Sequence, residues 1–520
     1  MTLQYIGPRI VPGLFELHNI SRAYEALDVV DDGMGTSYIA KIPVPVNIPL
    51  SNTTYWAVWG STSGAIIDLQ NQVSEIKSHI VTPEYYGAAG DGITDDTAAI
   101  NDMLANLNGG IALFTKNYLI DGAVTATHED GGLQVKSNST LIFTDGSTLI
   151  EKSNDAAMSH PLLLLDVENV TIEGVTVIGD YDTHTLSPGG TTDEWCHGIH
   201  VISSKNITIR NATIKDCYGD GIYIGQAWAA EVLNLPSDNH CRNVTVENVI
   251  IDKAGRNGLT LGDCDGWSIS NLNISNVTRT NPKAAIDIEQ EGDYSPYVSD
   301  GTLSEVNSTG CTVGVKVTQL TGARINLDGI TGNDTELVGN SSIINLHNAH
   351  GLVHVGGSIV KISDSDITYK ATYGNGLSWI TNSNVVFDGD CEVPLKLIGC
   401  LITGASTFKK YTYMHSCILR AAAGDTYYVK MKAALYIKDC EFEDIPATIE
   451  HLVVDDTNSR YYQLDMIGCT SSSTVSSIAT AMVSTNYAKM INGNNYFPFS
   501  TDASTAPVTG CVNINYNSYM

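Results

Sequence analysis

The sequence predicts an all-β protein whose body is a parallel β-helix, a solenoid in which short strands stack on one another rung by rung. Two repeated patterns predict this fold. One recurs at 198–201, 221–224, 258–261 and 285–288, as GIHV, GIYI, GLTL and AIDI. The other is led by Asn and recurs at 169–174, 206–211 and 243–248, as NVTIEG, NITIRN and NVTVEN. Near-identical strands at unequal spacing indicate a constant coil that carries loops of different lengths.

Each repeated segment alternates apolar and polar residues, which is the pattern of a strand with one buried face. Strands of four or five residues cannot bury their apolar faces alone, so the copies must stack to form a core. Asn tolerates the left-handed backbone that a sharp corner needs. We therefore expect Asn169, Asn206 and Asn243 at corners of successive rungs, which are spaced about 4.8 Å apart.

Residues 1–62 are predicted to form a small β-rich module that attaches the chain to another protein or binds carbohydrate. The run 35–60, GTSYIAKIPVPVNIPLSNTTYWAVWG, resembles short modules near the start of phage tail fibres and spikes. Its aromatic residues could hold a sugar, but packing in a core is the favoured interpretation. They are Tyr38, Tyr55, Trp56 and Trp59.

Residues 63–81 are predicted to form a helical stem. Apolar residues recur there with heptad spacing, at Ile66, Val73 and Ile80 and at Leu69 and Ile76. This spacing favours a coiled-coil seam, and β-branched residues at both seam positions favour a trimer over a dimer. The alternative is an amphipathic helix that packs on its own chain, because two heptads alone are marginal.

The segment 82–115 predicts a helix near 95–108 with Asp95 or Asp96 at its N-terminus. Its run YGAAGDGITDDTAAI (86–100) resembles the start of the pectate-lyase-like right-handed β-helix superfamily, in which this motif precedes a helix that caps the first rung. The resemblance implies a right-handed β-helix over 82–475 and a structural role for these acids. It does not select a reaction, because the superfamily contains lyases, hydrolases, epimerases and binding-only spikes. Residues 476–520 are expected to form a C-terminal cap or trimer contact.

Composition limits the partners. The formal charge of −29 disfavours nucleic acid and anionic membranes, which need clustered Lys and Arg. No run of 18 apolar residues exists, so no membrane insertion is expected. The start, MTLQYIGPRIVPG, lacks the basic end and apolar core of a secretory signal. Eleven Cys without a CxxC pair are interpreted as buried core residues, so we expect no metal and no cofactor.

Aligning the four strands places polar residues in columns on the outside of one wall. One column holds His200, Tyr223, Thr260 and Asp287. The column before it holds His197, Asp220, Asn257 and Ala284, and the column after it holds Ile202, Gly225, Gly262 and Glu289. Any solvated sheet face has polar columns. Two features suggest more: Asp287 and Glu289 share one face, and glycines in the two preceding rungs could leave a hollow beside Glu289.

Glycoside hydrolysis commonly uses two carboxyl groups across the scissile bond. Asp287 and Glu289 lie about 7 Å apart along one face of a strand, because the side-chain period is two residues. We predict that they are catalytic, with Asp220 as a possible third acid. The alternative is that all three are surface acids.

Three loops border the predicted wall and could form a groove, because binding residues concentrate on loops held by a rigid scaffold. They span 180–196, 226–240 and 290–300. The predicted substrate-binding residues are Trp195, His197, His200, Tyr223, Trp228, Arg256, Asn257 and Tyr294. A lyase would need a base and a cation that neutralises a uronate carboxylate. The two histidines, Tyr223, Arg256, Lys283 and Lys316 could supply both.

The arrangement of module, stem and capped β-helix resembles bacteriophage tailspikes. The resemblance implies a homotrimer on the virion tail, made in the host cytoplasm without a signal peptide. It further implies attachment to a phage tail or baseplate protein through the N-terminal module and a bacterial surface polysaccharide, capsule or O-antigen, as substrate. The first hypothesis is a glycoside hydrolase that depolymerises this polysaccharide. A polysaccharide lyase and a receptor-binding spike without catalysis remain alternatives.

Overall fold

The structure is a computed structural model, and contacts divide the chain into two units, Met1–Val81 and Thr82–Met520. Most of the predicted stem, 62–79, lies outside the described residues, as does most of the predicted C-terminal segment. The described ranges are 4–6, 9–11, 15–34, 36–61, 80–107, 109–125, 130–227, 235, 239–290, 298–321, 324–340, 343–373, 376–423, 425, 427–431, 435–443, 451–455, 464–467, 469–471, 479–480 and 490–492.

The first unit contains a hairpin and a small four-stranded sheet. The hairpin is β1 (Gln4–Ile6) and β2 (Arg9–Val11), and the sheet is β3 (Phe15–Leu17), β4 (Val29–Asp31), β5 (Thr36–Ala40) and β6 (Trp56–Ser61). Trp56 is buried with Tyr24, Val30, Ala40 and Val44, whereas Trp59 is 47% exposed. Trp56 is therefore a core residue, and Trp59 is not.

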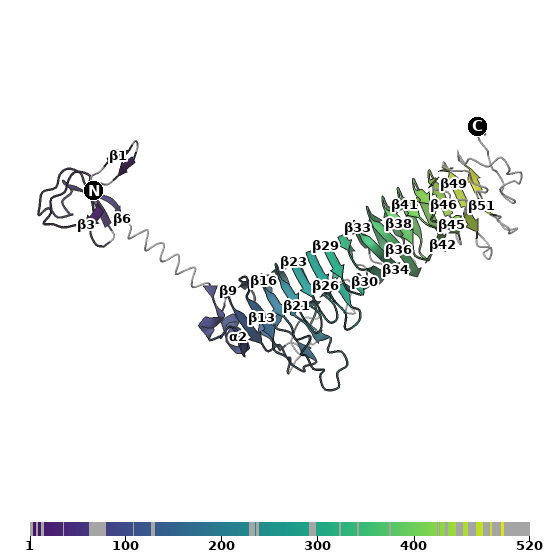
Figure 1. Ribbon diagram of the computed structural model, residues 1–520, viewed down its shortest axis with the longest axis horizontal. Coiled ribbons are helices and arrows are strands. Elements are labelled where there is room, and N and C mark those ends of the chain that lie inside the picture. Colours follow the sequence, from purple (N-terminus) through teal and green to yellow (C-terminus); the bar gives the residue numbers. More distant parts are fainter. Residues whose placement is uncertain are drawn as a thin grey trace. The chain divides into compact units, whose positions relative to one another are not determined.

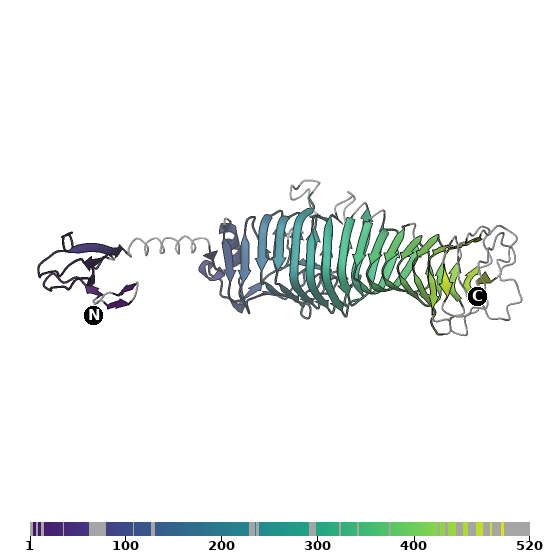
Figure 2. The ribbon, with the colours of Figure 1, turned by 90° about the horizontal axis from the view of Figure 1, so that it is seen from above.

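The second unit is a solenoid of stacked parallel strands (Figures 1 and 2). The wall that holds the predicted site columns is called the site sheet. Its strands are β11 (Leu133–Gln134), β15 (Leu162–Leu165), β19 (Ile199–Ile202), β22 (Ile222–Gly225), β24 (Leu259–Leu261), β27 (Ala284–Glu289), β30 (Val313–Thr321), β32 (Thr335–Asn340), β34 (His350–Gly356), β36 (Asp366–Tyr373), β38 (Asn384–Phe387), β41 (Leu401–Thr403), β44 (Ile418–Arg420), β47 (Glu441–Glu443) and β50 (Thr470–Ser471).

The other walls are formed mainly by one extended sheet, called the long sheet. The first unit ends with β7 (Ile80–Val81). Within the second unit, the strands of the long sheet are β8 (Asp91–Asp95), β9 (Ile111–Phe114), β10 (Asn117–Ile120), β12 (Thr140–Phe143), β13 (Thr148–Glu151), β16 (Glu168–Glu173), β17 (Thr176–Ile178), β20 (Lys205–Arg210), β21 (Thr213–Lys215), β23 (Cys241–Asp252), β25 (Cys264–Asp265), β26 (Ser268–Ser275), β28 (Val298–Ser299), β29 (Gly301–Thr309), β31 (Arg324–Thr331), β33 (Ile343–His347), β35 (Ile359–Ser363), β37 (Ser378–Thr381), β40 (Leu395–Ile398), β43 (Thr412–His415), β46 (Leu435–Lys438), β49 (Leu464–Ile467) and β52 (Met490–Asn492).

Two smaller sheets complete the unit. One pairs β14 (Met158–Ser159) with β18 (Trp195–Cys196). The other contains β39 (Asp390–Cys391), β42 (Ser406–Phe408), β45 (Tyr427–Met431), β48 (His451–Asp455) and β51 (Ala479–Thr480).

Asparagines form the corners, as the sequence predicts. Asn169, Asn206 and Asn243 have φ of 58°, 55° and 55°, in the left-handed region. The side-chain amide of Asn206 donates to Asn169 Oδ1 at 2.9 Å, and that of Asn243 donates to Asn206 Oδ1 at 3.1 Å. Each corner therefore hydrogen-bonds to the corner before it, which fixes the stacking register.

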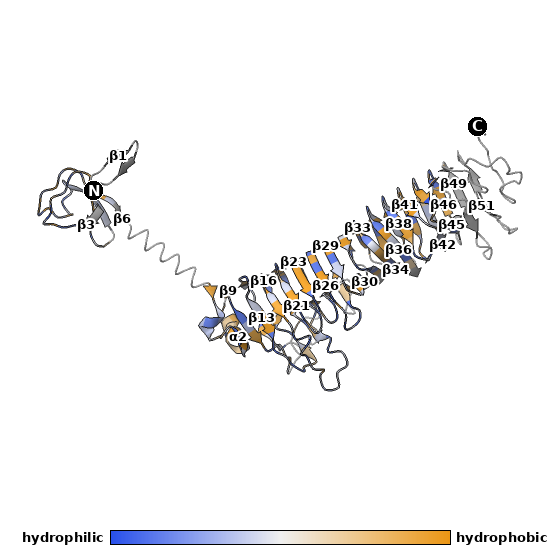
Figure 3. Cartoon of the chain, in the orientation of Figure 1, coloured by the Kyte–Doolittle hydropathy of each residue, from blue (hydrophilic) through white to orange (hydrophobic). Residues whose placement is uncertain are grey.

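The core lies inside the walls. Ile199, Ile222, Leu259 and Ile286 point inward and have no exposed surface. Apolar segments recur along the stacked strands (Figure 3). All ten described cysteines are buried and free, as expected of small core residues. The predicted fold class, an all-β parallel β-helix, is confirmed.

The predicted N-terminal helix is α2 (Thr97–Asn106), which lies against β11 and the short helix η1 (Pro83–Tyr86). Asp96 precedes α2, but its carboxylate accepts hydrogen bonds from the backbone N–H groups of Ala89 and Gly90 at 2.6 and 3.0 Å. Asp96 thus ties the preceding loop to the helix start. Within the described ranges, no helix is long and apolar enough to cross a membrane.

Candidate active site

The predicted register of the site sheet is correct. His200 pairs with Tyr223, Tyr223 with Thr260, and Thr260 with Asp287, so the four side chains lie in one column. Lys316 follows Asp287 in the next rung. We call these residues, together with His197, Asp220, Arg256 and Asn257, the column site.

The preceding column is joined by hydrogen bonds from each rung to the next. The backbone N–H of Asp220 donates to His197 Nδ1 at 3.2 Å. The N–H of Asn257 donates to Asp220 Oδ1 at 2.9 Å, and the N–H of Ala284 donates to Asn257 Oδ1 at 3.1 Å. Each polar side chain therefore satisfies a buried amide in the following rung, which such a group requires.

Asp220 is fully buried and has three kinds of partner. Thr260 Oγ1 donates to Asp220 Oδ2 at 2.7 Å, and Arg256 Nη1 lies 3.3 Å from the same oxygen. Burial raises the pKa of Asp220 to about 6, against the opposing effect of the Arg256 charge. Asp220 is therefore a carboxyl group that titrates near neutrality while held by a cation.

Asp287 is fully buried with one oxygen engaged. Its Oδ2 accepts from Asn257 Nδ2 at 3.4 Å and lies 4.0 Å from Lys316 Nζ. Its Oδ1 is buried and has no hydrogen-bond partner in the described part of the chain. Burial raises the pKa of Asp287 to about 7; Lys316 opposes this rise and the charge of Glu289 adds to it. Asp287 therefore retains its proton up to neutral pH.

One hydroxyl and one amide connect the two acids. Asn257 Nδ2 donates to Thr260 Oγ1 at 3.0 Å as well as to Asp287, and Thr260 passes the connection to Asp220. A change of charge on one carboxyl group therefore affects the other through a short buried network, where the low local dielectric strengthens each interaction.

Three histidines lie at the other end of the column. His160 Nδ1 lies 3.3 Å from His200 Nδ1, and the ring of His197 stacks on Tyr223 with centroids 4.9 Å apart. Burial lowers the pKa of His160 to about 4 and those of His197 and His200 well below the ordinary value. All three imidazoles are therefore neutral at pH 7.

The structure corrects two expectations about this wall. The outward column is not a solvated face, because Tyr223, Thr260 and Asp287 have no exposed surface and His200 has 5%. The expected glycine hollow is also absent at Gly225: a Cβ there would lie 2.8 Å from the hydroxyl of Tyr223, so the Tyr223 ring fills the space. Glu289 is only partly buried.

The predicted substrate-binding residues divide into three groups. His197, His200, Tyr223 and Asn257 are buried and hold the site together. Trp195 and Arg256 lie at its edge, with the guanidinium 5.5 Å from the Trp195 ring centroid. Trp228 and Tyr294 lie outside the described residues.

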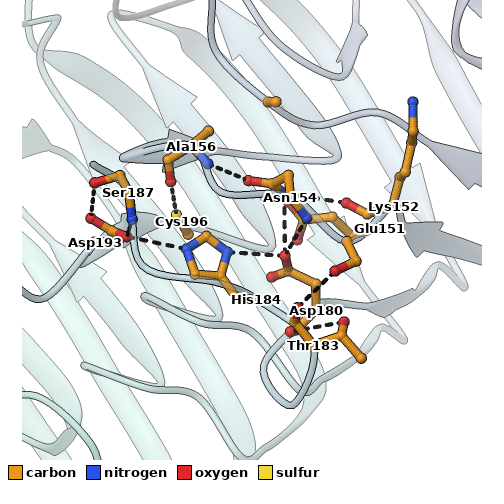
Figure 4. A network of polar contacts seen from close by, with 12 residues as sticks. Glu151, Lys152, Asn154, Ala156, Asp180, Thr183, His184, Ser187, Asp193 and Cys196 are labelled. Carbon is orange, nitrogen blue, oxygen red and sulfur yellow. Dashed lines mark hydrogen bonds and ion pairs between the residues drawn. The ribbon is translucent and has the colours of Figure 1, made fainter. Parts of the chain in front are cut away.

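Sequence reasoning missed a second buried network, formed by Glu151, Asp180, His184 and Asp193, which we call the loop network (Figure 4). His184 Nδ1 lies 3.0 Å from Asp180 Oδ2, and His184 Nε2 lies 3.3 Å from Asp193 Oδ2. Burial, together with the charge of Asp180, raises the pKa of Glu151 to about 8. Burial alone would lower the pKa of His184, but the two carboxylates outweigh it and raise that pKa.

The loop network anchors the 180–196 loop that ends at the column site. Ser187 also binds Asp193, through its N–H and its hydroxyl, both at 2.6 Å. Directly after this anchor, Glu194 lies 3.7 Å from Arg256 Nε, and Trp195 contacts His197 and Tyr223 edge-on. The signal in the sequence was a loop in which several acids surround a single histidine. Within the described residues, no group of three or more His, Cys, Asp or Glu side chains is placed to hold a metal ion.

Parts of the chain are similar in sequence to known proteins. No protein-family model matches the chain. It is 30% identical over 189 residues to the SPbeta prophage-derived uncharacterized protein YorA of Bacillus subtilis (strain 168), covering 34% of this chain and 32% of that protein. It is 23% identical over 183 residues to Depolymerase 1, capsule KN3-specific, of Klebsiella phage KN3-1, covering 34% and 23%. The chain spans about a third of the length of the first curated relatives it matches.

A solved structure shares the fold. A tailspike protein mutant of E. coli bacteriophage HK620, in complex with pentasaccharide, superposes with a TM-score of 0.50 at 10% identity, covering 74% of this chain and 80% of that one. At this identity the likeness concerns the fold alone. The matches agree with the resemblance to phage tailspikes and depolymerases that contain a parallel β-helix.

Proposed function

We propose that this chain is a phage tail-associated enzyme that degrades a bacterial surface polysaccharide by glycoside hydrolysis at the column site. One observation supports the hydrolase assignment most directly. Asp287 is a buried carboxyl group with a pKa of about 7 and a free Oδ1 in the described structure. A general acid must hold its proton at the working pH, and the oxygen that delivers the proton must not already be occupied by a protein group. Because Oδ1 is buried, the leaving group has to displace the side chains that cover it.

Asp287 is the proposed general acid. Its burial costs the ionised form more than the neutral form, so the proton stays on the carboxyl group until sugar binds. Substrate must reach Oδ1 from the side where Lys316 and Glu289 are partly exposed, since the other oxygen is held by Asn257. Protonation of the glycosidic oxygen then leaves Asp287 ionised beside Lys316, whose charge stabilises the product carboxylate.

Glu289 is the proposed second carboxylate. It lies two residues further along β27, on the same face, and its charge acts on Asp287. Two such side chains can be about 5–5.5 Å apart, as in retaining enzymes, or about 6.5–9.5 Å apart, as in inverting enzymes. Both oxygens of Asp220 are already engaged, by Asn257 N–H and by Thr260 and Arg256, and we assign it a positioning role through Thr260 and Asn257.

The comparisons support the substrate class. One relative is a capsule-specific depolymerase of a Klebsiella phage, and another derives from a prophage. We propose capsule or O-antigen as the substrate, a homotrimer as the assembly, and a tail or baseplate protein as the partner of the N-terminal module. No cofactor is part of the proposed reaction.

A polysaccharide lyase is the second candidate, favoured by the neutral histidines and by two cations, Arg256 and Lys316, beside the acids. Arg256 is already paired with Asp220 and Glu194, which leaves it less available to neutralise a uronate carboxylate. His197 already accepts a backbone N–H at Nδ1, which leaves that nitrogen unavailable for proton abstraction. A binding-only spike is the third candidate.

Product analysis of purified capsular and O-antigen polysaccharides separates these candidates. A hydrolase releases only new reducing ends, a lyase also releases products with ultraviolet absorbance from a new C=C bond, and a spike releases neither. Asp287→Asn and Glu289→Gln should each lower kcat by roughly 10²–10⁴-fold while the polysaccharide still binds. Asp388→Asn, which changes an exposed acid paired with Lys370, is the matched control. Cleavage by Asp287→Asn at the native rate would refute the assignment of Asp287 as the general acid.

A further inference from the structure

The outside of the long sheet carries a row of lysine and aromatic side chains, remote in sequence from the column site. Lys361, Trp379, Lys396, Tyr413 and Tyr436 are direct partners in five successive strands, from β35 to β46. We call this row the aromatic strip. Since neighbouring strands are about 4.8 Å apart, it extends for about 19 Å along the solenoid axis.

Its members contact one another across neighbouring strands: the lysine ammonium groups lie near aromatic rings, and two tyrosine rings stack. Lys396 Nζ lies 5.1 Å from the centroid of Trp379 and 5.5 Å from that of Tyr413, and Lys361 Nζ lies 5.6 Å from Trp379. The rings of Tyr413 and Tyr436 stack 5.0 Å apart with their planes 6° from parallel. Trp379 is 39% exposed. The strip is therefore an ordered surface and not a set of independent side chains.

The charge of the strip is unusual for this chain. The protein has a formal charge of −29, yet in the described structure neither Lys361 nor Lys396 forms an ion pair. Three acids near the strip are already engaged: Asp328 and Asp364 with His347, and Asp439 with His415 and Lys438. Asp465 follows Tyr436 in the next strand, at the end of the strip away from Lys361 and Lys396. The two ammonium groups therefore remain available for an anionic ligand.

We propose that the aromatic strip is a second binding surface, for a linear polysaccharide that bears carboxylate groups. Exposed ring faces suit the apolar face of a sugar, and lysine ammonium groups suit carboxylates. One side chain per rung on a rigid scaffold presents the same contacts repeatedly, as a polymer of repeated units requires. A second copy of this chain carries the same net charge of −29, so two copies repel one another as whole molecules. Association of copies through the strip is an outcome of the test. The proposal does not rest on cleavage at the column site.

The test measures binding of the full chain to polygalacturonate and, as the uncharged counterpart, to fully methyl-esterified pectin. Affinity electrophoresis and titration should show that the native chain binds polygalacturonate more tightly, and that added salt weakens binding. Trp379→Ala and the double variant Lys361→Gln/Lys396→Gln should each lower the affinity by about tenfold. The two lysines point outward, so the double variant should leave the thermal unfolding midpoint unchanged. Trp379 is only 39% exposed, so Trp379→Ala should lower the midpoint modestly.

Lys370→Gln is the control, because Lys370 lies on the site sheet and is paired with Asp388. It should leave binding unchanged. Equal binding by the strip variants and the native chain, or no binding of polygalacturonate at all, overturns the proposal. It is also overturned if the strip variants alter the oligomeric state in sedimentation, because the face is then an interface between copies. Asp287→Asn should bind polygalacturonate through the strip as the native chain does. Failure of the strip proposal can therefore be distinguished from failure of the column-site assignment.

Discussion

Replacing Asp287 by Asn should stabilise the β-helix at pH 8 and leave its stability unchanged at pH 4. The reason is that the pKa of Asp287 differs between the folded and the unfolded chain. The pKa of Asp287 is about 7 in the fold, because burial disfavours the ionised form, whereas an unfolded Asp titrates near 3.9. Between these values the folded chain binds more protons than the unfolded chain. The free energy of unfolding therefore falls as the pH rises from about 4 to about 7, and is level above that.

The magnitude follows from the width of this window. Each pKa unit corresponds to about 1.4 kcal/mol, so three units amount to about 4 kcal/mol that ionisation of Asp287 removes from stability at pH 8. The side chain is almost entirely buried, so solvent screens little of this effect. Asn has nearly the same shape, can accept from Asn257 in place of Oδ2, and never ionises.

Urea unfolding of the native chain and of Asp287→Asn at pH 4, 6 and 8, with one unfolding slope for both, measures the difference. We expect almost no difference at pH 4, about two thirds of the full gain near pH 6, and about 4 kcal/mol at pH 8. Asp388→Asn is the control and should give a small effect at every pH, because Asp388 is an exposed partner of Lys370. Destabilisation by Asp287→Asn at pH 8 would refute the reasoning, since it would mean that Lys316 and Arg256 make the ionised form favourable.

Three further predictions concern other parts of the molecule. Arg256→Gln removes the cation that lowers the pKa of Asp220, so any limb of the pH–rate profile that reports Asp220 should move to higher pH; an unmoved profile assigns that limb to another group. Asn206→Ala should lower the free energy of unfolding by about 1–3 kcal/mol, and Asn206→Gly should lower it by about 1 kcal/mol less. Both variants lose the corner hydrogen bonds, but only Ala is strained at positive φ. Equal urea midpoints for the two variants would contradict this. His184→Ala should speed chymotrypsin cleavage at Leu186. Because the pKa of His184 is raised, its ion pairs protect the native loop fully below about pH 6.5 and lose their effect as the pH rises through the folded pKa, so the variant should differ most at low pH.

The stacking register could be predicted because local chemistry determines it. Asn169, Asn206 and Asn243 occupy corners that only a residue tolerant of positive φ can fill, and the apolar alternation between corners allows one pairing. A slip of one residue would turn every core side chain outward. The column from His200 to Asp287 followed from this register, and so did the alignment of Lys316 with Asp287.

Burial of that column could not be predicted. An outward polar residue in a solenoid faces water unless another segment covers it, and the strand pattern does not report on covering segments. Trp195 contacts His197 and Tyr223 from the end of an irregular loop. The loop network could not be predicted from the sequence for a related reason. Glu151 and Asp180 belong to different rungs, and only the loop conformation brings His184 between Asp180 and Asp193.

The rung-to-rung hydrogen bonds from His197 to Ala284 limit how this region can diverge. A single rung exchanged for one from a relative would leave the amide of its successor without an acceptor, or an acceptor without its amide. An exchange of rungs with a relative that leaves stability unchanged therefore has to include all residues from His197 to Ile288 together. Chimeras joined outside this block should fold stably, whereas chimeras joined inside it should be destabilised.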